Sequence, residues 1–72
     1  MNKKNKIKIV VNGRLLTVKI KFSLKNLIEK LKTPINRIAI ELNEEIVDKK
    51  KLSKIFLKNR DKIEIVHFIG GG

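Results

Sequence analysis

Cysteine is absent from this 72-residue chain, and histidine occurs once, as His67. Without thiols the chain can form no disulfide and offers neither a thiolate nucleophile nor cysteine ligands for a metal. One histidine cannot assemble a metal centre alone, and the carboxylates of Glu41, Glu44 and Glu45 surround a predicted turn, where such groups are usually solvated. We therefore expect no metal site and no catalytic residue, and His67 is assigned no catalytic role.

Aromatic residues and long apolar runs are also scarce. The chain has three phenylalanines and neither tyrosine nor tryptophan, so it offers few platforms on which nucleic-acid bases could stack. No apolar run approaches the roughly 20 residues that span a bilayer, and the amino terminus lacks the apolar stretch of a signal peptide. We expect a soluble protein inside the cell, with no membrane partner.

Acidic residues are outnumbered by basic ones, seven to eighteen, which gives a formal net charge of +11. Such an excess is typical of nucleic-acid-binding proteins, because lysine and arginine displace counterions from phosphates. However, lysine, isoleucine and asparagine, which all have AT-rich codons, together make up 34 of the 72 residues. A low-GC genome could supply much of the charge, so a small basic nucleic-acid-binding domain is an alternative and not the main interpretation.

The length allows one domain with a small core, near the lower limit for independent folding. Residues 1–6 contain three lysines and are predicted to form a basic, flexible leader. Residues 7–69 have the apolar patterns of a single domain, and residues 70–72 are a glycine tail. There is no room for a second, catalytic domain.

Alternation of apolar and polar residues predicts five strands. The first two flank Asn12-Gly13, a strong hairpin signal, and a third runs from Arg37 to Leu42. After a turn at Asn43-Glu44 a short strand covers Glu45 to Val47, and the last strand covers Lys62 to Phe68. The strand side chains expected to face the core are Ile7, Ile9, Val11, Leu16, Val18, Ile20, Phe22, Ile38, Ile40, Leu42, Ile63 and Ile65.

One helix is predicted over residues 24–32, between the second and third strands. The hydroxyl of Ser23 can cap its first turn, and Pro34 ends it by disfavouring helical geometry at the residue before. Residues 49–57 are predicted to cross the domain as an irregular or short helical segment. The buried stripe of the helix consists of Leu24, Leu27, Ile28 and Leu31, and the crossing segment buries Leu52, Ile55 or Leu57.

These elements predict an α+β fold in the order strand, strand, helix, strand, strand, strand. The economical arrangement is a mixed sheet with the one main helix packed across one face, because the helix stripe and the inner faces of the strands each need a partner. If the first and last strands are central neighbours, Val10 and Val66 lie exposed together on the other face, near Ala39, with Lys19 and Lys21 toward one edge. Such an apolar spot is typical of a protein interface, although scattered exposed valines need no function.

Three of the four glycines form the end of the chain, Gly70-Gly71-Gly72. Glycine has no Cβ and adopts backbone angles closed to other residues. A glycine tail can therefore thread a narrow enzyme channel and bring its terminal carboxylate to a buried reagent, with Phe68 and Ile69 anchoring its base. The alternatives are a frayed terminus, and a Phe68-Ile69 pair that only completes the core.

The segment from Asp61 to Gly72, with the sequence DKIEIVHFIGGG, resembles the end of the ThiS family, the sulfur carriers of thiamine biosynthesis, which have the ubiquitin-like β-grasp fold. Residues 9–13 and 38–43, followed by Ile46-Val47, support the resemblance, which covers about residues 7–72. The chain departs from the family pattern at Asp48 and Leu52, where the family often has a proline and an aromatic residue. That departure concerns packing of the crossing segment and not the tail.

The resemblance implies a protein substrate and carrier, not an enzyme. A ThiF-like adenylating enzyme would use MgATP to convert the Gly72 carboxylate to an acyl-adenylate. Sulfur from a cysteine desulfurase would displace AMP, and the resulting thiocarboxylate would donate its sulfur to thiazole synthase, ThiG. Gly70 and Gly71 would lie in the partner's channel, the chain would bind no cofactor itself, and it would be monomeric when free. The residues expected at the partner interface are Val10, Val66, Phe68 and Ile69.

Two further carrier-like alternatives stay open beside the nucleic-acid-binding domain. The small subunit of molybdopterin synthase, MoaD, is a sulfur carrier of the same fold that also ends in Gly-Gly. A ubiquitin-like modifier would instead form isopeptide bonds between Gly72 and lysines of other proteins. The expected compartment is the cytoplasm, or the plastid stroma if the chain is organelle-encoded.

Overall fold

A computed structural model describes residues 5–68, and its helices and strands follow the predicted order. Residues 1–4 and 69–72, which include most of the predicted leader and the tail, lie outside the described residues. Lys6, the end of that leader, already pairs with Lys19 as part of the first strand. Two short 3-10 helices, η1 and η2, precede the third and the last strand. The elements are β1 Lys6–Val11, β2 Arg14–Lys19, α1 Leu24–Lys30, η1 Ile35–Arg37, β3 Ile38–Leu42, β4 Glu45–Ile46, η2 Lys49–Lys54 and β5 Lys62–His67.

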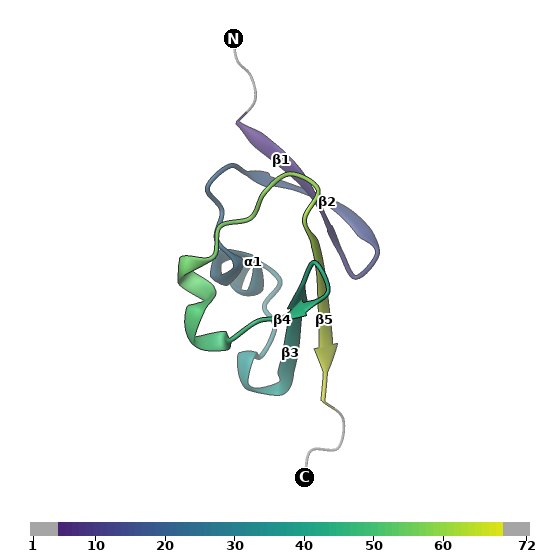
Figure 1. Ribbon diagram of the computed structural model, residues 1–72, viewed down its shortest axis with the longest axis vertical. Coiled ribbons are helices and arrows are strands. Elements are labelled where there is room, and N and C mark those ends of the chain that lie inside the picture. The colour runs from purple at the N-terminus through teal and green to yellow at the C-terminus, as the bar shows by residue number, and fades with distance from the viewer. Residues whose placement is uncertain (1–4, 69–72) are drawn as a thin grey trace.

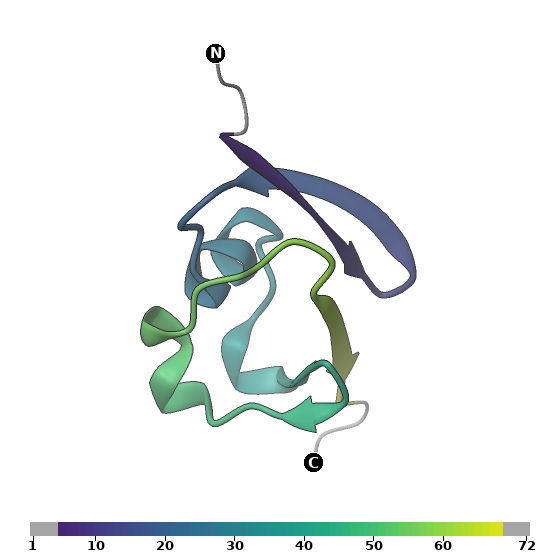
Figure 2. The same cartoon turned by 45° about the horizontal axis from the view of Figure 1, so that its top comes forward.

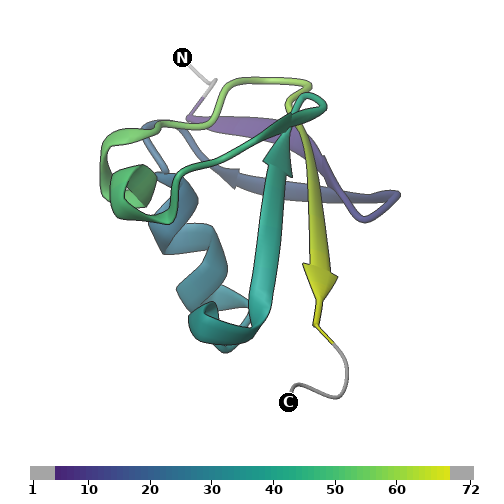
Figure 3. The same cartoon turned by 60° about the horizontal axis from the view of Figure 1, so that its bottom comes forward.

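The five strands form one sheet in the order β2-β1-β5-β3-β4. β1 and β5 are parallel, whereas the other neighbours are antiparallel. The prediction of a mixed sheet is therefore confirmed, and the first and last strands are neighbours within it, which was the condition for placing Val10 and Val66 together. The β1–β2 hairpin forms one end of the sheet (Figure 2). Helix α1 and η2 lie on the same side of it, so the described elements leave the opposite face of the sheet uncovered (Figures 1 and 3).

Helix α1 begins where the sequence predicts it. Asn26 N donates to Ser23 Oγ at 3.0 Å, and Ser23 N donates to Asn26 Oδ1 at 3.1 Å, so each residue satisfies a backbone group of the other. The helix ends at Lys30, two residues before the predicted end. Lys32 has a positive φ of 55°, and Thr33 N donates to Ile28 O at 3.3 Å, which is the Schellman closure usually made by glycine. The chain thus leaves the helix before the proline can act.

One apolar core fills the space between the sheet, α1 and the crossing segment. Two residues predicted to face it are exceptions, Ile20 at 43% exposed and Leu31 at 38% exposed. Ile20 lies beyond the end of β2, where Lys21 turns the chain with φ 65°, so strand alternation no longer sets the direction of its side chain. The buried core residues are Ile9, Val11, Val18, Leu24, Leu27, Ile28, Ile38, Ile40, Leu52, Leu57, Ile63 and Ile65.

Candidate functional site

The candidate site is the carboxyl end of β5, from which the predicted tail continues. β5 pairs with β3 as far as the pair of His67 and Ile38, and Phe68 N then donates to Arg37 O at 2.8 Å. Backbone hydrogen bonds therefore fix the chain up to Phe68, the last described residue. Ile69, Gly70, Gly71 and Gly72, which carry most of the predicted site, lie outside the described residues.

The other side of β5 is held by a side chain of the hairpin turn. The strand pairing of β1 with β5 covers only Val10 and Val11. Beyond it, Asn12 Oδ1 accepts from Ile65 N at 2.7 Å and Asn12 Nδ2 donates to Ile65 O at 3.3 Å. The side-chain amide of Asn12 thus makes the two hydrogen bonds to Ile65 that the backbone of β1 would make if the strand continued. Asn12 and Gly13 form the two-residue turn with φ angles of 50° and 82°, which asparagine and glycine tolerate best.

An apolar spot lies on the uncovered face of the sheet near this exit. Val66 is 52% exposed and pairs with Ala39 of β3, as predicted from their alternation. The next pair on the same face is Glu64 and Glu41, so two carboxylates border the spot on that side. Phe68 is 56% exposed and therefore does not complete the core, which was one of its two predicted roles.

Val10 does not join this spot, and the prediction that it lies together with Val66 is wrong. It faces the same side of the sheet, but it pairs with Lys62, four residues before Val66 and about 13 Å from it along the strand. The cause is the register of the parallel pair, which places Val10 opposite the first residue of β5 and not opposite its carboxyl half. Val10 instead lies beside Leu15 of the edge strand β2, the strand that also carries Lys19.

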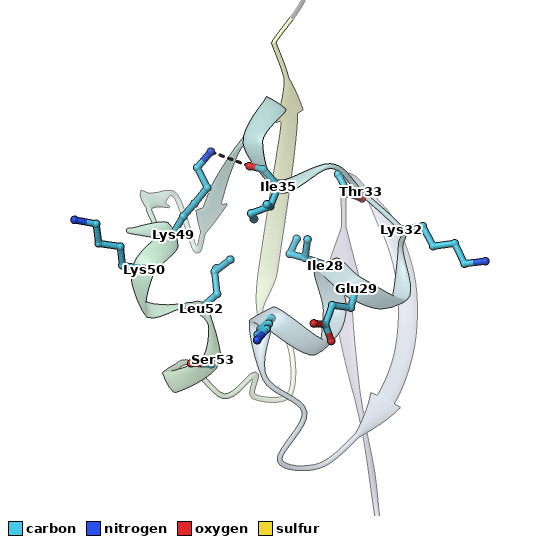
Figure 4. A pocket seen from close by; sticks show the side chains of 10 residues that line it. Ile28, Glu29, Lys32, Thr33, Ile35, Lys49, Lys50, Leu52 and Ser53 are labelled. Carbon is cyan, nitrogen blue, oxygen red and sulfur yellow. Dashed lines mark hydrogen bonds between the residues drawn. The ribbon is translucent and has the colours of Figure 1, made fainter.

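A lysine that the sequence analysis did not single out contacts the exit of β5. Lys49 Nζ donates to Ile38 O at 2.6 Å and to Ile35 O at 3.0 Å, the latter bond drawn in Figure 4. The same ammonium group lies 5.8 Å from the ring centroid of Phe68. No sequence signal distinguishes Lys49 from the chain's other lysines, because its partners are backbone carbonyls brought to it by the fold.

The described residues form no catalytic constellation around His67. His67 is exposed at the end of β5, and within residues 5–68 no serine or carboxylate makes a hydrogen bond to its ring. Nor do the described residues bring together three side chains of histidine, aspartate or glutamate as metal ligands. None of the helices between residues 5 and 68 has the length and apolar character needed to cross a membrane.

A hollow of about 390 Å³ lies between α1, η1 and η2 (Figure 4). Its floor is apolar and its rim carries four lysines and one glutamate, without a histidine. Thr33 and Ser53 also line it, and the Thr33 hydroxyl donates to the backbone carbonyl of Leu31 at 3.5 Å. The hollow is lined by Lys25, Ile28, Glu29, Lys32, Thr33, Ile35, Lys49, Lys50, Leu52 and Ser53.

Comparison with known proteins decides the family. The family model described as "ThiS family" matches residues 9–72. The chain belongs to the ThiS family. The match includes β5 and the glycine tail, so it covers the segment on which the sequence resemblance was based. The resemblance and the β-grasp fold that it implies are both confirmed.

A solved ThiS structure has the same fold over nearly the whole chain. The crystal structure of the thiamine biosynthesis protein ThiS from Geobacter metallireducens matches with a TM-score of 0.79 and 28% identity, over 92% of this chain and all of that one. The match supports the mixed sheet, and with it the position of β5 at the centre.

Two curated relatives carry functional names. The sulfur carrier protein ThiS of Bacillus subtilis is 49% identical over 35 residues, which are 49% of this chain and 53% of that protein. A thiazole synthase of Paramagnetospirillum magneticum is 35% identical over 66 residues, which are 92% of this chain. The chain spans only 20% of that synthase, so the ThiS-like stretch accounts for a fifth of the longer protein.

Proposed function

We propose that this ThiS-family chain is a sulfur carrier for the thiazole moiety of thiamine and that its reactive group is the carboxylate of Gly72. The observation that carries the proposal is the match of the family model through residue 72, on a chain whose β5 is held on both sides up to Ile65. Hydrogen bonds hold the strand that precedes the tail, and the tail itself consists of glycines, which have no Cβ to obstruct a channel. In this proposal the chain is a substrate of enzymes and is not itself an enzyme.

The chemistry requires activation of the terminal carboxylate. A free carboxylate is a poor electrophile because its charge is delocalised over two oxygens, whereas an acyl phosphate anhydride has a good leaving group. An adenylating enzyme would transfer AMP from MgATP to Gly72 and release pyrophosphate. The persulfide of a cysteine desulfurase would then attack the acyl carbon, forming the C–S bond as AMP leaves. A second thiol, such as that of free cysteine, would reduce the resulting acyl disulfide, releasing the thiocarboxylate and forming a new disulfide. The thiocarboxylate product is itself a strong, soft nucleophile at neutral pH.

Thiazole synthase is the proposed acceptor of this sulfur. The proposal is supported by the P. magneticum thiazole synthase, which carries a stretch 35% identical to this chain within its own length. A donor and an acceptor that share one chain meet at a high effective concentration, which suits a transfer between them. When donor and acceptor are two separate proteins, docking surfaces on the carrier must bring them together, and the adenylating enzyme must recognise the carrier as well.

The intact mass of the protein tests this function. We expect that incubation with MgATP, the adenylating enzyme, a desulfurase and cysteine replaces one oxygen by sulfur, with the change mapped to Gly72 and absent without ATP. An unchanged mass, with the enzyme active on another carrier, would contradict the proposal. High-mass conjugates that resist boiling in detergent and reductant would indicate a modifier instead.

The apolar spot at Val66 is the proposed docking surface for the adenylating enzyme. We expect Val66→Asn to raise the KM for adenylation about tenfold, because a desolvated apolar contact at an interface is commonly worth 1–2 kcal/mol. Leu15→Asn is the matched control, since Leu15 is 67% exposed on the hairpin strand β2 of the same face. Steady-state kinetics would measure both variants, and equal effects of the two would exclude a specific surface at Val66.

A further inference from the structure

Lys49 makes three contacts at the carboxyl end of β5 that the proposed function does not yet use. Its ammonium group donates to Ile38 O, at the start of β3, and to Ile35 O, in η1, at 2.6 and 3.0 Å. The same Nζ atom lies 5.8 Å from the centroid of the Phe68 ring, within the range of a cation–π interaction. One charged group therefore joins η1, β3 and the residue that precedes the tail.

The backbone of Lys49 is fixed in a way that aims its side chain. Lys49 is the first residue of η2, and Asp48 precedes it as the N-cap. Asp48 Oδ1 accepts from Lys50 N at 2.9 Å, and Lys51 N donates to Asp48 O at 2.9 Å. These bonds fix the backbone at the start of η2, and the Lys49 side chain extends from it toward η1 independently of its contact with Phe68. Figure 4 shows the resulting orientation, with Lys49 directed to Ile35 and Lys50 directed away.

Phe68 otherwise has few restraints. Its side chain is 56% exposed, and its backbone is held by the bond from its N–H to Arg37 O. Arg37 belongs to η1, the element whose carbonyl group at Ile35 is bound by Lys49. Lys49 therefore acts on Phe68 twice, through the ring and through η1, which accepts the backbone bond.

We propose that Lys49 is a positioning residue that holds Phe68 and so fixes the point from which the tail starts. The inference rests on the proposed function of Gly72. Four residues separate Phe68 from the end of the chain, and they can reach at most about 14 Å. If the base of the tail were free, part of the binding energy would be spent on ordering it whenever it enters an enzyme. By holding Phe68, Lys49 removes that cost in advance.

Lys49→Met tests the inference, because methionine keeps an unbranched chain and removes the charge and the donors. We expect the KM for adenylation to rise about two- to fivefold, the size of one exposed cation–π contact, with kcat within about twofold of the wild type. Lys49→Arg keeps the positive charge and the donors, so its KM should stay close to that of the wild type. Lys50→Met, the matched control on the next residue, removes the same charge and should leave the KM unchanged.

A double-mutant cycle with Phe68→Leu separates positioning from general effects on the fold. Phe68→Leu removes the ring that Lys49 contacts, so we expect Lys49→Met to have a clearly smaller effect in that background. Fully additive effects, or equal effects of Lys49→Met and Lys50→Met, would overturn the proposal. A loss of kcat without a change of KM would overturn it as well.

Amide hydrogen exchange reports on the same contact without any enzyme. In the full chain we expect the Phe68 amide to exchange about tenfold faster in Lys49→Met than in the wild type, while the amides of Ile63 and Ile65 keep their protection. Unchanged exchange at Phe68 would refute the role of Lys49. If the wild-type chain is never adenylated, the proposed function fails, and this measurement still decides whether Lys49 holds Phe68.

Discussion

A variant that ends at Gly70 is expected to fold as the full chain does and to acquire no sulfur. A carboxylate oxygen of the terminal residue must approach the α-phosphorus of ATP to within about 3.5 Å, and the loss of Gly71 and Gly72 shortens the reach of the chain by about 7 Å. A new carboxylate at Gly70 therefore stops short of the reagent. Intact mass after incubation with the adenylating enzyme and the sulfur source should show no change, and rescue of a thiamine-requiring strain should be lost.

Deletion of Lys3 and Lys4 is the matched control for this truncation. It removes two residues from the other end of the chain and also lowers the charge. We expect it to retain both sulfur loading and rescue, and both truncated proteins to unfold at temperatures close to that of the full chain. Thiamine rescue by the chain that ends at Gly70 would refute the carrier mechanism. Loss of activity in both truncations would point to a general effect of charge or handling.

Ile63→Ala is expected to lower the free energy of unfolding strongly. Ile63 is 0% exposed on β5, between Val11 of β1 and Leu42 of β3. Truncation of a fully buried isoleucine costs about 2–5 kcal/mol, whereas a domain of this size has a free energy of unfolding of about 4–11 kcal/mol. The variant should therefore lose a large part of its stability, and urea denaturation should show a midpoint shifted far below that of the wild type.

Ile46→Ala is the control, because the same side chain is 71% exposed in the short strand β4. Its free energy of unfolding should change by less than about 0.5 kcal/mol. Similar losses in the two variants would mean that β5 is not the centre of the core. The two variants also show how strongly a loss of stability alone lowers sulfur loading. The loading of any functional variant should therefore be expressed per folded molecule.

Local patterns predicted the elements of this chain well. The cap at Ser23, the hairpin at Asn12-Gly13 and the short strand after Asn43-Glu44 each depend on neighbours within a few residues, so the sequence contains the whole signal. The helix end was placed two residues late because Lys32 adopts a left-handed conformation that is usual for glycine and costly for lysine. No rule based on residue type would have selected that position.

Contacts between distant segments were harder to predict. The error at Val10 arose from register, since alternation assigns a residue to a face but does not say which residue lies opposite it across a parallel pair. The double hydrogen bond of Asn12 to Ile65 and the contacts of Lys49 join residues far apart in the sequence. The reactive carboxylate proposed at Gly72 stays a prediction. The sequence alone could suggest it because a terminal carboxylate needs no fold to bring its parts together.

The turns of the domain use lysine, glutamate and arginine where many proteins use glycine. Lys21, Lys32, Glu44 and Arg60 all have positive φ, and Gly13 is the one glycine before the tail. Each such residue strains the folded state by about 1–2 kcal/mol. A glycine there would relieve this strain but would add about 0.4–1 kcal/mol of conformational entropy to the unfolded chain. The strain exceeds the entropy term by roughly 0.5–1 kcal/mol at each position, so the four turns together take up a few kcal/mol of the stability that a domain of this size has.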